Sequence, residues 1–128
     1  MHSRLAAASI ALLACLAAPA FAACEPDGTQ ASGSKYRICM PPAGQYNGKL
    51  VIWAHGFQDA GTPVSIPEDQ LCIGGACLPD VITQLGYGFA TNSYSKTGLA
   101  ILQGMNDIQD LVEIYAAQKG RPSKVYLV

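Results

Sequence analysis

The chain has 128 residues, of which 50% are hydrophobic and 13% charged, a composition typical of globular and not of disordered proteins. Its formal net charge is -1, so there is no basic surplus to neutralise phosphates, which argues against nucleic-acid binding. Removal of residues 1–22 would take away Arg4 and no acidic residue, which makes the net charge more negative by one. The remainder, residues 23–128, is enough for one small domain.

The N-terminus predicts a secretory signal peptide over residues 1–22. Arg4 supplies a positive charge, an uncharged apolar run follows, and Ala20-Phe21-Ala22 has the small residues that a signal peptidase requires. A transmembrane anchor and lipidation at Cys15 are the alternatives, but the run is short for a bilayer span and stays apolar past Cys15. We therefore expect a secreted or periplasmic protein with no stable membrane span afterwards, cleaved after Ala22 or, as the second choice, after Ala23.

The first half of residues 23–128 indicates two strands. Residues 24–34 are rich in turn-forming types and are expected to be irregular. Residues 35–40 alternate modestly, which predicts an edge strand that ends before Pro41. The run 49–54 is almost entirely apolar, as in a strand covered on both faces of a parallel sheet. Residues 55–77 then read as one long loop, a length that usually signals function or disorder.

The second half predicts helix, strand, helix and strand. A short helix is expected over 79–85, between Pro79 and Gly86, followed by a strand over 87–92. Apolar residues recur at helical spacing over 99–119, and the last apolar run is a strand over 125–128. This alternation predicts an α/β fold with a parallel sheet, whose ligand site lies beyond the carboxyl ends of the strands. We expect the solvated face of the long helix to carry three acidic side chains, those of Asp107, Asp110 and Glu113.

Four cysteines remain when Cys15 leaves with the signal peptide. An even number in an exported chain suggests two disulfides, for which three pairings are possible. Proximity favours Cys24 with Cys39 and Cys72 with Cys77. A zinc site is disfavoured, because no C-x-x-C spacing occurs and residues 23–128 hold a single histidine. We expect no metal and no cofactor.

The stretch around that histidine resembles a known family. Residues 49–58, with the sequence KLVIWAHGFQ, are similar to the third strand and oxyanion loop of the α/β-hydrolase fold. The resemblance implies that the backbone N–H just after His55-Gly56 helps to hold the oxyanion of a tetrahedral intermediate. The donor would be Phe57, with Gln58 the next candidate. His55 would be structural, since the catalytic histidine of this family comes much later in the chain.

The order of the later elements extends this resemblance over residues 36–128. The helix 99–119 and the strand 125–128 are similar to the helix and strand that lead into the G-x-S-x-G nucleophile elbow of the family. That motif is absent from the sequence. The resemblance therefore implies an incomplete domain, the N-terminal part of a secreted serine hydrolase, with the nucleophile, acid and base expected after Val128. It also implies that strands 51–54 and 125–128 lie side by side and parallel.

Two functions remain open. The first is an exported serine hydrolase that acts on a small-molecule ester, with a peptide as the less favoured substrate, and that is inactive as this chain alone because a nucleophilic serine needs its base. The alternative is a small, complete, secreted binding protein without enzymatic activity, which uses the loop 55–77 and its disulfide as a recognition surface.

Overall fold

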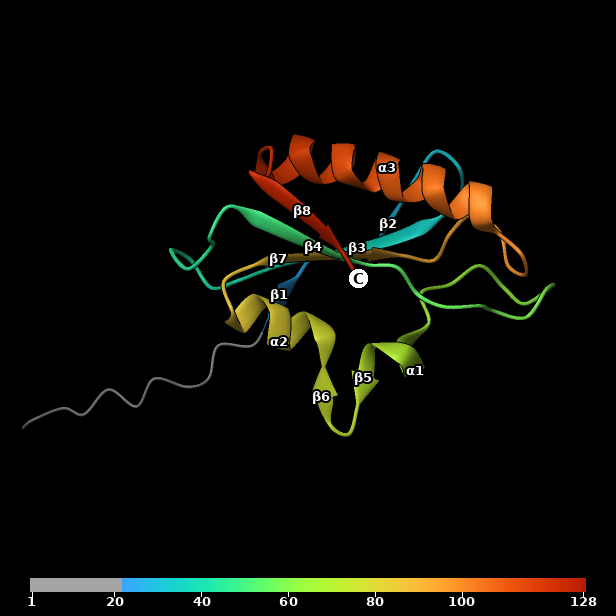
Figure 1. Cartoon of the computed structure of the whole chain (residues 1–128), viewed down its shortest axis with the longest axis horizontal. Helices are drawn as coiled ribbons and strands as arrows, with labels where there is room; N and C mark the ends of the chain where they lie inside the picture. The colour runs from blue at the N-terminus through green and yellow to red at the C-terminus, as the bar shows by residue number, and fades with distance from the viewer. Residues whose placement is uncertain (1–21) are drawn as a thin grey trace, which may run out of the picture.

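The computed structural model describes residues 22–128, so all of the predicted signal peptide except Ala22, with Cys15, lies outside the described residues. Six strands of the described part form one sheet: β1 (Ala23–Cys24), β2 (Gly28–Thr29), β3 (Lys35–Met40), β4 (Lys49–Trp53), β7 (Gly88–Asn92) and β8 (Lys124–Leu127). Their order is β1-β3-β7-β4-β8, and β2 pairs with β3 (Figure 1).

The centre of the sheet is parallel. Strand β4 pairs in parallel with β7 on one side and with β8 on the other, whereas β3 is antiparallel to β7. The register sets Leu50 opposite Val125 and Ile52 opposite Leu127. The prediction that these two strands lie side by side and point the same way is therefore confirmed. Strand β8 forms one border of the sheet as described.

Helices cover both faces of this sheet (Figure 1). The long helix α3 (Ile101–Lys119) lies on one face and α2 (Leu78–Gln84) on the other. Both begin and end close to their predicted bounds. Pro79 lies in the first turn of α2, and Gly86 follows its end with φ +85°, a conformation that favours glycine. The prediction of a mostly parallel α/β sheet with flanking helices is confirmed.

The core has two parts because alternate side chains of the buried strands point to opposite faces. Leu50 and Ile52 of β4 pack with Leu111 and Tyr115 of α3, and all four are fully buried. On the other face Phe89 of β7 packs with buried side chains of the segment before and around α2. The near-continuous apolar run that suggested a strand covered on both sides thus has a helical layer on each side.

Two segments that were expected to be irregular contain regular structure. The segment 24–34 includes β1 and β2, and the loop 55–77 includes a short helix and a hairpin: α1 (Glu68–Leu71), β5 (Cys72–Ile73) and β6 (Ala76–Cys77). Disulfides account for part of this order, since Cys24 is bonded to its ladder partner Cys39, and Cys72 to its ladder partner Cys77. These are the two pairings that proximity favours.

Arg37 of β3 connects two of these segments. Its guanidinium donates to both carboxylate oxygens of Asp27 at 2.7 and 2.8 Å, and to both of Glu68 at 2.9 and 2.6 Å. The hydrogen bonds to Asp27 and then to Glu68 raise the pKa of Arg37 above its already high value, so the charge persists at every practical pH. Only 20% of the side chain is exposed.

We expect Arg37→Met to lower the free energy of unfolding by about 1 kcal/mol, because it removes two bidentate ion pairs near the surface. Urea unfolding followed by circular dichroism measures this difference. Arg121→Met is the matched control, since Arg121 pairs with Glu113 and both side chains are well exposed. Equal effects of the two substitutions would contradict the role assigned to Arg37.

Candidate active site

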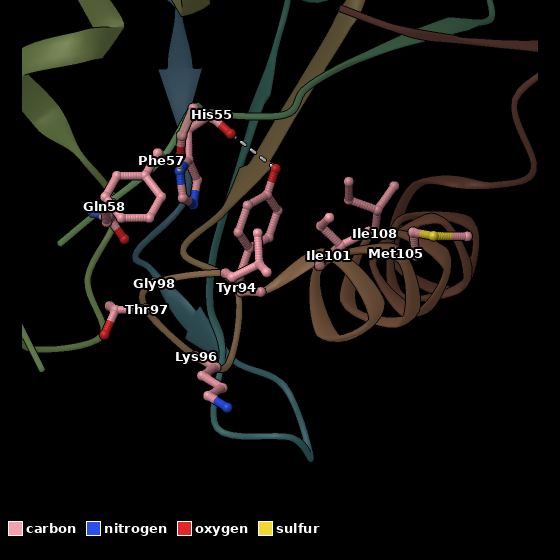
Figure 2. Close-up of a pocket in the computed structure, with 14 residues that line it drawn as sticks. His55, Phe57, Gln58, Tyr94, Lys96, Thr97, Gly98, Ile101, Met105 and Ile108 are labelled. Carbon is pink, nitrogen blue, oxygen red and sulfur yellow. Dashed lines mark hydrogen bonds between the residues drawn. The ribbon is translucent and has the colours of Figure 1, made fainter. Parts of the chain in front are cut away.

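A cavity of about 390 Å³ opens at the carboxyl ends of β4 and β7 (Figure 2). Three segments line it: residues 55–58 after β4, residues 94–100 after β7, and the first turns of α3. This is the end of a parallel sheet at which ligands of α/β proteins bind. Much of its wall is apolar, from the side chains of Phe57, Leu99, Ile101, Met105 and Ile108.

All four residues of the predicted oxyanion loop, residues 55–58, border this cavity. Three of their carbonyl groups accept hydrogen bonds from other groups of the protein. The carbonyl oxygen of His55 accepts a hydrogen bond from the Tyr94 hydroxyl at 3.0 Å (Figure 2). That of Gly56 accepts from Nδ1 of His55 at 2.7 Å, and that of Gln58 accepts from the backbone N–H of Gly98 at 2.9 Å. Three of the four carbonyls of the loop thus have protein partners.

The backbone amides of the same loop are free. Within residues 22–128, the N–H groups of Gly56, Phe57 and Gln58 donate to no protein acceptor. Backbone donors without partners at the edge of a cavity are what a negatively charged oxygen requires. The loop therefore offers donors to a ligand, while three of its four carbonyls are bonded within the protein.

His55 is buried, and its ring contacts that of Tyr94. Only 5% of it is exposed, and its ring stacks on that of Tyr94 with 4.0 Å between the ring centres. Because a carbonyl oxygen only accepts, the bond to Gly56 requires the proton to be on Nδ1. The other nitrogen, Nε2, is buried and has no partner in the described part of the chain.

Tyr94 lines the cavity, although it was not among the predicted site residues. It has φ +52°, and it is the one non-glycine residue with positive φ in the part of the chain that the structure describes. Such a conformation in a bulky residue is rare and points to a constraint from its surroundings. Burial raises the pKa of its hydroxyl, which keeps the proton that it donates to His55. Nothing in the sequence of residues 93–96 indicates that Tyr94 has a positive φ or that its ring stacks on His55.

The segment that carries Tyr94 is fixed by a buried polar network. Oδ2 of Asp107 accepts from the backbone N–H of Ser95 at 2.6 Å, and the carbonyl of Asp107 accepts from Gln30 at 2.8 Å. Gln30 in turn accepts from Asn92 at 3.1 Å. Asp107 is only 3% exposed, so its assignment to the solvated face of the helix was wrong, whereas Asp110 is exposed as expected.

Residues 22–128 contain neither a candidate metal-binding cluster nor a membrane-spanning helix. No group of three or more histidine, cysteine, aspartate and glutamate side chains is arranged to hold a metal ion there. Within the same residues, every helix is too short or too polar to cross a membrane.

Comparison with known proteins gives one clear relationship. No family model matches the sequence, and no curated protein matches it. A solved structure, XC6422 from Xanthomonas campestris, described as a member of a/b serine hydrolase without lid, matches with a TM-score of 0.56 at 14% identity. The chain has an α/β-hydrolase-like fold. The match covers 85% of this chain and 50% of that one, so the chain spans about half the length of this structural neighbour.

Proposed function

We propose that this chain is the N-terminal part of an exported serine hydrolase and supplies one half of its oxyanion hole. In this proposal the hydroxyl oxygen of a serine located after Val128 attacks the acyl carbon of the substrate and gives its proton to a histidine base. The carbonyl oxygen of the substrate becomes negatively charged and accepts a hydrogen bond from the N–H of Phe57. Residues 1–22 direct export, and the two disulfides accord with an oxidising compartment.

The observation that carries the proposal is the loop 55–58, with free amides beside a cavity at the carboxyl ends of parallel strands. A second observation supports it. The backbone N–H of Ala54 donates to the carbonyl of Val128 at 2.8 Å. A residue that follows Val128 would therefore lie beside Ala54, the residue before His55. A nucleophile elbow at that position would lie close to the free amides, as catalysis requires.

The cavity favours an ester substrate. Apolar side chains of Phe57, Ile101 and Met105 offer an apolar acyl or alcohol group a place to pack, and all three are more than half exposed in this structure. A peptide substrate would bring backbone N–H and carbonyl groups that these side chains cannot satisfy. We therefore propose a carboxylic ester hydrolase, with peptidase activity the less favoured alternative.

Covalent labelling with a fluorophosphonate probe tests the proposal. The gene is read past Val128, and the protein with the following segment is expressed with its signal peptide and exposed to the probe. We expect labelling at a serine within G-x-S-x-G, and its loss when that serine is replaced by alanine. The 128-residue chain is the matched control and is expected to remain unlabelled, because it has no such motif.

A stop codon directly after Val128, with a folded and soluble product, would overturn the hydrolase proposal. It would favour the second function, a small secreted binding protein. The disulfide-closed hairpin of β5 and β6 would then be the first surface to test, because Ile73 near its tip is 75% exposed.

A further inference from the structure

Tyr94 lies between the predicted oxyanion loop and the long helix. Its ring stacks on the imidazole of His55 at an interplanar angle of 29°. On the helix, a Cβ added to Gly104 would lie 3.2 Å from the Tyr94 ring, so the backbone of α3 approaches this ring closely. In Figure 2 the ring of Tyr94 stands between His55 and α3. The ring therefore has little freedom to move.

Tyr94 and His55 together hold two consecutive peptide groups. The hydroxyl of Tyr94 donates to the carbonyl of His55, which belongs to the His55–Gly56 peptide. Nδ1 of His55 donates to the carbonyl of Gly56, which belongs to the Gly56–Phe57 peptide. The described residues contain no cis peptide bond, and in a trans peptide the N–H points opposite to the carbonyl. Fixing the Gly56 carbonyl therefore fixes the direction of the Phe57 N–H.

We propose that Tyr94 is a positioning residue of the oxyanion loop: with His55, it holds the Gly56–Phe57 peptide so that the Phe57 N–H stays directed away from the protein and free for the substrate oxygen. The inference rests on the proposed function for its catalytic meaning, but not for its geometry. It explains why a tyrosine adopts a positive φ after β7, since that conformation brings its ring onto His55.

The tautomer of His55 is the first test. Because His2 and His55 are the only histidines in the sequence, ¹⁵N-histidine labelling of residues 23–128 gives one imidazole to observe. The proposal expects the proton on Nδ1 at neutral pH, with its signal protected from exchange with water. A proton on Nε2 alone would overturn the proposal, and this measurement needs no substitution.

Substitutions test the two hydrogen bonds separately. Tyr94→Phe keeps the ring stacked on His55 and removes only the hydroxyl, so we expect the amide signals of residues 56–58 to shift and broaden as the loop samples more than one conformation. His55→Leu should do the same, and His55→Asn should restore much of the wild-type spectrum, because its side-chain amide can donate to the Gly56 carbonyl. Tyr87→Phe is the matched control, since no hydrogen bond to its hydroxyl is found among residues 22–128. Spectra of Tyr94→Phe that match those of Tyr87→Phe would overturn the proposal.

The catalytic consequence is measured on the protein that carries the segment after Val128. There Tyr94→Phe is expected to lower kcat about tenfold with little change in KM, because an oxyanion donor acts mainly in the transition state. If the loop signals change as expected but no serine is labelled by fluorophosphonate, the positioning role stands and the hydrolase function fails. If the serine is labelled but kcat is unchanged in Tyr94→Phe, the hydrolase stands and the positioning role fails.

Discussion

Gly88→Ala is expected to lower the free energy of unfolding by about 3 kcal/mol, at the upper end of the range for an overfilled core. Gly88 lies in β7, at the centre of the sheet between β3 and β4. A Cβ at this position would lie 2.1 Å from the hydroxyl oxygen of Tyr115 and 2.9 Å from the ring carbon that bears it. Tyr115 of α3 is fully buried in the core with Leu50 and Ile52 of β4, so its ring cannot move away without disturbing the core.

A double-mutant cycle checks this explanation. Tyr115→Phe removes the atom in the closest contact, so Gly88→Ala should be less harmful in the Tyr115→Phe background than in the wild type. The rescue should be partial, because the ring carbon remains within 2.9 Å of the new methyl group. Urea unfolding of the four proteins gives the coupling energy. Strictly additive effects would show that the contact with Tyr115 is not the cause.

Loss of the Cys24–Cys39 disulfide is expected to destabilise the protein by about 3 kcal/mol, against about 2 kcal/mol for Cys72–Cys77. The reason is loop length: the first bond joins residues 15 apart in sequence and the second joins residues 5 apart. Cys39 is also fully buried in the core beside Phe89, whereas Cys72 is exposed. Replacing each pair by alanines compares the two bonds.

Chemical unfolding under non-reducing conditions measures both effects. The pair Cys72→Ala and Cys77→Ala serves as the control for the pair Cys24→Ala and Cys39→Ala, because each variant loses one disulfide and keeps the other. A larger loss from the Cys72–Cys77 pair would contradict the loop-length argument. It would mean that the hairpin of β5 and β6 organises more of the neighbouring structure than its size suggests.

Most of the sheet could be predicted from sequence because its elements have strong local patterns. The apolar run before His55 is typical of a strand that is covered on both faces. The helical periodicity of residues 99–119 extends over five turns and is followed directly by Gly120. The disulfide partners followed from proximity along the chain. The prediction that residues 55–58 lie at a ligand-binding edge rests on a local signal too, a His-Gly pair directly after a buried strand, and these residues do line the cavity.

What could not be predicted depends on contacts between distant segments. The short strands β1 and β2 exist only because β3 pairs with them, and their own residues favour turns. Asp107 is buried because the side chain of Gln30 and the N–H of Ser95 surround it, and neither lies near it in sequence. The same applies to Tyr94, whose hydroxyl and ring contact His55 across 39 residues of chain.

The pairing of β4 with β8 has a consequence for the loop that follows β4. The partners of β8 lie 75 residues earlier in the chain, so closing this ladder restricts a long loop. The same pairing continues into the hydrogen bond from the N–H of Ala54 to the carbonyl of Val128. The residue next to His55 is therefore anchored by a contact between segments that are distant in sequence.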